Sequence, residues 1–127
     1  MAISFNEDSV FNLRQIPLEH VRDDVDSIMT SGEVYVMAFQ TVRDQLVFTN
    51  KRIISIDLQK LTGKRRTFTS MPYSRIQYFS IETPALIEIF PDSRLSVVFT
   101  DGVTAVFEFK GRIDISKIGR AISEYIL

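Results

Sequence analysis

The spacing of hydrophobic residues changes twice along the chain, and each change predicts a different kind of element. In residues 17–29 four apolar residues recur at the spacing of one helical face: Leu18, Val21, Val25 and Ile28. Pro17 suits the first turn of a helix, where a missing N–H group costs little. Gly32 can adopt the left-handed conformation that ends one. The pattern therefore predicts an amphipathic α-helix over 17–29.

From residue 33 onward the pattern becomes short and alternating, in runs rich in β-branched and aromatic residues. Seven such runs predict strands: 33–41, 46–49, 52–58, 65–70, 76–83, 94–100 and 103–109. Asp101-Gly102 predicts a tight hairpin between the last two, with positive φ at both turn residues and Thr100 opposite Val103. The stretch 84–93 has a proline near each end and fits either a strand or a covered loop.

The last segment returns to helical spacing, with Asp114 placed to cap its start. One face carries Ile115, Ile118, Ile122 and Tyr125/Ile126, and Lys117, Arg120 and Glu124 point elsewhere. Seven short antiparallel strands in one open sheet would expose an apolar face, so we expect a barrel or two packed sheets. The isoleucine face would then cover the open corner, at about 1.5–3 kcal/mol for each buried side chain. We predict one domain, 1–127, made of an N-terminal extension with its helix (1–31), a β-barrel or sandwich (33–109) and a capping helix (113–127).

Composition is consistent with one ordinary hydrophobic core. The 127 residues are 45% hydrophobic and include ten Phe and four Tyr, which supply much of the large side-chain volume. The chain has no Cys, its first residues do not resemble a signal peptide, and no apolar run approaches the length of a membrane span. We therefore expect a soluble, cytoplasmic protein.

Candidate catalytic residues are scarce, and we predict no catalytic, metal or cofactor site. His20 is the only His, and there is no Cys to act as a nucleophile. Asp23, Asp24 and Asp26 would point in different directions on a helix and lack the loop spacing of a calcium site, which favours a solvated acidic face. The five Gly are not clustered into a phosphate-binding loop.

Net charge of −1 argues against a general nucleic-acid binder, but the charges are unevenly distributed. Residues 1–32 hold six acidic and two basic residues, whereas residues 43–66 hold seven basic and two acidic ones. The candidate contacts for an anion or an acidic partner are the seven bases: Arg43, Lys51, Arg52, Lys60, Lys64, Arg65 and Arg66. The candidate acidic contacts lie on the predicted first helix: Glu19, Asp23, Asp24 and Asp26.

Several short motifs, in order, resemble those of the small bacterial pleckstrin-homology (PH) domains. They are VFTNKRII at 47–54, Gly63-Lys64, MPYSRI at 71–76 and FSIET at 79–83. The resemblance covers most of the chain from about Gly32 onward, and the preceding acidic helix also suits the family. It implies a seven-stranded antiparallel barrel or sandwich with a C-terminal capping helix. Bacterial PH domains are thought to assemble into rings, so the resemblance also implies a homo-oligomer.

Two departures from the wider PH superfamily limit what the resemblance implies. Phosphoinositide-binding members cluster Lys and Arg around the first strand–strand turn, whereas residues 41–44 here offer one Arg beside an Asp. Eukaryotic PH domains also typically carry a Trp in the last helix, and this chain has no Trp. We therefore expect no inositol-phosphate binding in the eukaryotic manner, and the lipid-binding function does not follow from the fold.

These observations predict a non-enzymatic binding or assembly module that contacts other proteins, acting as a homo-oligomer. In that hypothesis the acidic helix of one copy meets the basic region of the next, head to tail. One alternative is a peripheral binder of anionic lipid or of an acidic partner through the basic 60–66 loop. Another is a small barrel enzyme or carrier with an interior pocket. The basic loop is also consistent with a solvated loop that protects a sheet edge.

Overall fold

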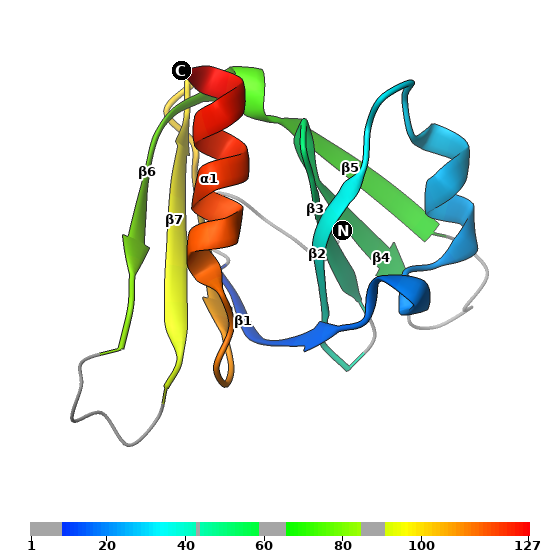
Figure 1. Cartoon of the computed structure of the whole chain (residues 1–127), viewed down its shortest axis with the longest axis horizontal. Coiled ribbons are helices and arrows are strands. Elements are labelled where there is room, and N and C mark those ends of the chain that lie inside the picture. The colour runs from blue at the N-terminus through cyan, green and yellow to red at the C-terminus, as the bar shows by residue number, and fades with distance from the viewer. Residues whose placement is uncertain (1–8, 43, 59–65, 85–90) are drawn as a thin grey trace.

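The computed structural model describes residues 9–42, 44–58, 66–84 and 91–127, which form two packed sheets with one helix across them (Figure 1). The first half comprises β1 (Ser9–Ile16), the 3-10 helices η1 (Leu18–His20) and η2 (Asp23–Ile28), β2 (Tyr35–Gln40), β3 (Gln45–Thr49) and β4 (Arg52–Leu58). The second half comprises β5 (Arg66–Pro72), η3 (Tyr73–Arg75), β6 (Ile76–Glu82), β7 (Ser93–Phe99), β8 (Thr104–Phe109) and α1 (Ile115–Ile126). The seven predicted strands and the C-terminal helix are confirmed. The alternative strand at 86–90 lies outside the described residues.

One strand that the alternation did not predict, β1, joins the two sheets. The strand order is β5-β4-β3-β2-β1-β8-β7-β6. The second half of β1 pairs antiparallel with β2, and its first half pairs parallel with β8. The described residues therefore form eight strands with one parallel pairing, where we expected seven antiparallel strands. The sheet does not close into a barrel, because β5 and β6 remain unpaired with each other at its two ends.

A backbone irregularity at Asn12 explains why β1 escaped prediction. Asn12 has φ 61°, and the register with β8 shifts between Val10 and Leu13. This shift interrupts the alternation of inward and outward side chains, which is the signal by which a strand is recognised from sequence. The irregularity lies where β1 leaves β8 and begins to pair with β2.

Asn12→Val is expected to lower the free energy of unfolding by about 1–2 kcal/mol, since a β-branched residue strongly disfavours positive φ. Asn12→Gly is the control and is expected to stay within about 0.5 kcal/mol of wild type, because glycine adopts this conformation without a steric penalty. Urea unfolding of both variants measures the difference. Equal stabilities of the Val and Gly variants would contradict a conformational role for Asn12.

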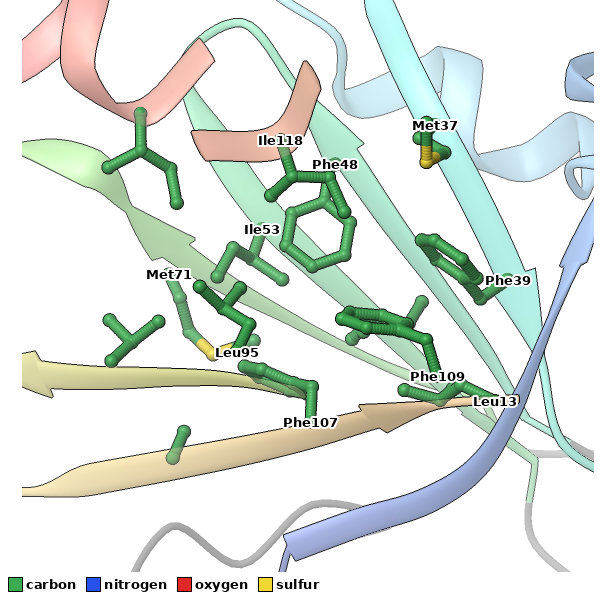
Figure 2. Close-up of a cluster of buried hydrophobic side chains, with 14 of the residues drawn as sticks. Leu13, Met37, Phe39, Phe48, Ile53, Met71, Leu95, Phe107, Phe109 and Ile118 are labelled. Carbon is green, nitrogen blue, oxygen red and sulfur yellow. The ribbon is translucent and has the colours of Figure 1, made fainter. Parts of the chain in front are cut away.

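The main core lies between the two sheets and beneath α1 (Figure 2). Phe39 and Phe109 approach with ring centroids 4.5 Å apart, and Phe48 meets Phe39 edge to face at 5.9 Å. The predicted isoleucine face of the helix is buried here through Ile115, Ile118 and Ile122. Gly119 allows α1 to approach β6 closely: a Cβ atom at this position would lie 2.6 Å from Ile81 Cδ1.

A second core covers the outer face of β2–β4, and the N-terminal segment supplies its lid. Its buried members are Ile16, Val21, Val25, Ala38, Val47, Ile54 and Ile56. The segment is not the α-helix that we predicted over 17–29, but two separate 3-10 helices. Val21 and Arg22 between them are extended, with ψ of 139° and 136°. The Arg22 N–H donates to Gln45 Oε1 instead of to a helical carbonyl, so contact with β3 replaces helix continuity.

The hairpin at Asp101-Gly102 is confirmed, but its predicted geometry was wrong. Only Gly102 has positive φ, at 89°. The Gly102 N–H donates to the Phe99 carbonyl, and the Phe99 N–H donates to the Val103 carbonyl. The loop therefore has three residues and Phe99, not Thr100, lies opposite Val103, as in the common hairpin whose third loop residue is left-handed.

Candidate functional site at the sheet edges

The basic residues predicted as contacts are only partly within the described chain. Four of the seven lie outside it: Arg43, Lys60, Lys64 and Arg65. Arg66, at the start of β5, forms an ion pair with Asp24 of η2 at 3.3 Å. Lys51, in the β3–β4 turn, donates to Thr30 Oγ1 and to the Ser31 carbonyl. These contacts join the basic region to the N-terminal segment of the same chain.

The four predicted acidic contacts divide into two pairs: Glu19 and Asp23, and Asp24 and Asp26. Glu19 and Asp23 are exposed. Asp24 pairs with Arg66, and Asp26 accepts a hydrogen bond from the Tyr35 hydroxyl. Burial, and then the Asp26 carboxylate, raise the pKa of Tyr35. Part of the charge complementarity seen in the sequence is therefore used within one molecule.

Arg52, also predicted as a contact, is the centre of a buried ion-pair cluster. Its Nε donates to Glu33 Oε2 at 2.8 Å, and its Nη2 donates to Glu33 Oε1 at 2.9 Å. The same Nη2 donates to the Ile28 carbonyl. The Glu33 side chain is 0% exposed and that of Arg52 is 15% exposed. Such a two-pronged pair is among the strongest side-chain contacts, and here it fixes the end of the N-terminal segment to β4.

Further hydrogen bonds complete the cluster around Glu33. The Thr30 N–H and hydroxyl donate to Oε1, and the Thr49 hydroxyl donates to Oε2 at 2.7 Å. Burial alone would raise the pKa of Glu33, but the hydrogen bond from Arg52, followed by those from Thr30 and Thr49, outweighs it and holds the pKa at about 2. Sequence reasoning missed Glu33, although it is the only charged residue between 27 and 42.

The two ends of the sheet differ in how they are protected. β5 begins with Arg66 and ends with Pro72, and a charged residue and a proline are typical means of blocking further strand pairing. β6 contains no Lys, Arg or Pro, and its one charged residue is Glu82 at the end. No strand within the described parts of the chain pairs with the outer side of β6 (Figure 1).

β6 is also long and apolar enough to accept another strand. Its seven residues span about 23 Å at roughly 3.3 Å per residue. Tyr78 is 55% exposed, while Phe79 and Ile81 pack against the core. Alternate residues of an edge strand direct their N–H and C=O groups outward, where only water or an added strand can bind them. The sequence predicted this strand, but no sequence signal placed it at an edge.

The described residues contain neither a metal-ligand cluster nor a membrane-spanning helix. No group of three or more His, Asp or Glu side chains there is arranged to hold a metal ion. None of the described helices has both the length and the apolar character that crossing a membrane requires.

Two packed sheets joined by β1 and covered by a C-terminal helix define a PH-like fold, and comparison with known proteins agrees. The sequence matches the Bacterial PH domain family over residues 4–126. The chain therefore belongs to this family. It also resembles a solved DUF1696-family protein with a pleckstrin-homology domain from Shewanella loihica PV-4. That protein is 32% identical with a TM-score of 0.73, and the match covers 91% of this chain and 98% of the other.

Further relatives support the assignment. A pleckstrin homology domain from Shewanella amazonensis SB2B is 32% identical with a TM-score of 0.60, over 88% of this chain and 90% of that one. YjqA of Bacillus subtilis (strain 168), an uncharacterized protein, is 42% identical over 77 residues. This match spans 61% of the present chain and 60% of YjqA. YozO of the same strain, also uncharacterized, is 28% identical over 102 residues, 80% of this chain and 86% of YozO.

Proposed function

We propose that this chain is a non-catalytic, PH-like assembly module that works as a closed homo-oligomer, with β6 forming the contact between copies. The observation that supports it most directly is the contrast between the two ends of the sheet. β5 carries Arg66 and Pro72, whereas β6 presents a seven-residue edge without a basic residue or a proline. Natural proteins usually block such an edge unless a partner strand covers it.

The symmetry of the assembly depends on which edge β6 meets. Pairing of β6 with β6 uses the same surface on both copies and ends at a dimer. Pairing of β6 with β5 of the next copy would be head to tail and would form a ring where the rotation between copies closes. Neither outer edge has a strand partner among the described residues, but Arg66 and Pro72 disfavour pairing at β5, so we favour the β6–β6 dimer. The assembled mass, compared with the 14.6 kDa of one chain, distinguishes them.

The head-to-tail contact between acidic and basic regions is the competing arrangement. Its support is Glu19 and Asp23, which are exposed and take part in no ion pair between described residues. Salt separates the two models, because ion pairs between exposed groups weaken as ionic strength rises, whereas strand pairing with an aromatic contact does not. We expect the oligomer to persist in 1 M NaCl, where the Debye length is about 3 Å.

A double lysine substitution in β6, Tyr78→Lys with Ser80→Lys, is expected to convert the oligomer to a 14.6 kDa monomer. Both side chains are exposed, so the fold should tolerate them, while lysines on an edge repel an added strand. Size-exclusion chromatography with light scattering at about 100 µM measures the mass. Gln40→Lys is the control, because this exposed residue lies on β2 inside the sheet. A monomeric wild type, or an oligomeric double variant, would contradict the proposal.

A further inference from the structure

A groove runs along α1 on the side away from β6. It has a volume of about 390 Å³ and is lined from the helix by Lys117, Arg120, Ala121, Glu124 and Tyr125, and from the sheet by Val36 and Asn50. The helical residues are spaced at i, i+3, i+4, i+7 and i+8, so they share one face of α1. The small side chain of Ala121 leaves the middle of the groove open.

Both walls of the groove are held in place by contacts behind them. The Tyr125 ring meets the buried Tyr73 ring edge to face, with centroids 6.0 Å apart. The Tyr73 hydroxyl in turn donates to the Thr49 carbonyl at 2.6 Å. On the other side, Asn50 Oδ1 accepts from the Val34 N–H, and Asn50 Nδ2 donates to the Gly32 carbonyl. A ligand would therefore meet a site that is already formed, which reduces the entropy lost on binding.

Charge is unequally distributed along the groove. Lys117 and Arg120 are exposed near the start of α1, and no ion pair between described residues uses either one. The nearby Asp114 carboxylate accepts a hydrogen bond from the Ser116 hydroxyl. Glu124 lies one helical turn beyond Arg120 and two beyond Lys117, about 6 Å and about 10 Å along the axis. Apolar surface lies at the same far end, where Tyr125 is 46% exposed.

We propose that this groove binds a short acidic peptide segment of another protein that carries one large apolar side chain. Its carboxylate would lie against Lys117 and Arg120, and its apolar side chain against Val36, Ala121 and Tyr125. An aromatic anchor beside an arginine is the composition typical of binding hot spots. A concave site with Glu124 on its rim fits a peptide better than an anionic membrane surface. The groove does not include β6, so this inference is independent of the proposed assembly.

Panning a random 12-residue peptide library against the full-length protein tests the proposal. We expect enrichment of peptides in which Asp or Glu is followed or preceded at a fixed spacing by an aromatic or long aliphatic residue. Fluorescence anisotropy with an enriched peptide should show an affinity that falls as NaCl rises. Lys117→Glu with Arg120→Glu is expected to weaken binding on the order of tenfold, since two favourable charge contacts become repulsive.

The control variant, Arg75→Glu with Arg112→Glu, has the same net charge and replaces exposed residues outside the groove. It should bind like wild type, as should the β6 double-lysine variant. A peptide with its acidic residues changed to Lys should recover binding to the Lys117→Glu, Arg120→Glu variant, which shows that this variant is folded. Enrichment without acidic residues, equal loss in the control variant, or charge-dependent binding to phosphatidylglycerol vesicles in place of any peptide would overturn the proposal.

Discussion

Arg52→Met is expected to lower the free energy of unfolding by about 3–5 kcal/mol, because breaking a buried ion pair leaves one charge without its partner. Removing the guanidinium leaves the Glu33 carboxylate, 0% exposed, without its charged partner. It also removes the donors to the Ile28 carbonyl and to Ser70 Oγ. Urea unfolding at neutral pH measures the loss.

Two further variants test whether this loss comes from the unpaired charge. Glu33→Leu combined with Arg52→Met removes both charges and should recover a substantial part of the stability, because neither ion is then buried alone. Arg75→Met removes an exposed arginine that belongs to no such cluster among the described residues and should stay within about 0.5 kcal/mol of wild type. A loss below about 1 kcal/mol for Arg52→Met would show that water reaches Glu33 and that the cluster contributes little.

The same cluster predicts a specific dependence of stability on acid. The pKa of Glu33 is about 2 in the folded chain, against an ordinary value of 4.5. Below pH 4.5 the unfolded chain binds a proton at this residue that the folded chain does not, so stability falls as the pH decreases from about 4.5 to about 2. The contribution is fully present above pH 4.5 and amounts to about 3 kcal/mol at roughly 1.4 kcal/mol per pKa unit.

Glu33→Gln isolates this contribution from those of the other carboxyl groups. The variant should be less stable than wild type at neutral pH, and the difference between the two should shrink by about 3 kcal/mol between pH 5 and pH 2. Unfolding in urea at several pH values in this range provides the comparison. Parallel curves for the two proteins would mean that Glu33 has an ordinary pKa in the folded chain.

The sequence predicted elements better than their connections. Alternation located all seven strands after residue 33, because each has a sheet face that must be buried. In the N-terminal segment the helical spacing correctly marked Val21 and Val25 as buried but not the backbone between them. Two separate 3-10 helices can also bury every third or fourth residue. The hydrogen bond from the Arg22 N–H to Gln45 favours them over one continuous α-helix. The irregularity at Asn12 interrupts the alternation of inward and outward side chains in β1, so the pattern did not predict this strand.

The candidate sites depended on information that a single sequence lacks. Strand order decides whether β6 is central or at an edge, and the sequence of β6 is compatible with either position. The groove could not be predicted from the sequence, because only the fold places Val36 and Asn50 opposite the polar helix face that carries Lys117, Arg120 and Glu124. The uneven charge distribution predicted partner contacts in the basic region, but Arg52 of this region pairs with Glu33 inside the molecule.

The pairing of β1 with β8 has a consequence for how the protein forms on the ribosome. Leu13 lies beside Phe109, and the Lys110 N–H donates to the Leu13 carbonyl, so contacts between residues far apart in the sequence complete the structure. Loop closure over such a distance is slow, and domains emerge N-terminus first during synthesis. The β2–β5 hairpins are complete within the first 72 residues and form from local contacts. β1 is made before the strands that follow it but must wait for β8 before one of its edges is covered, which leaves that edge exposed to mispairing until β8 has been made.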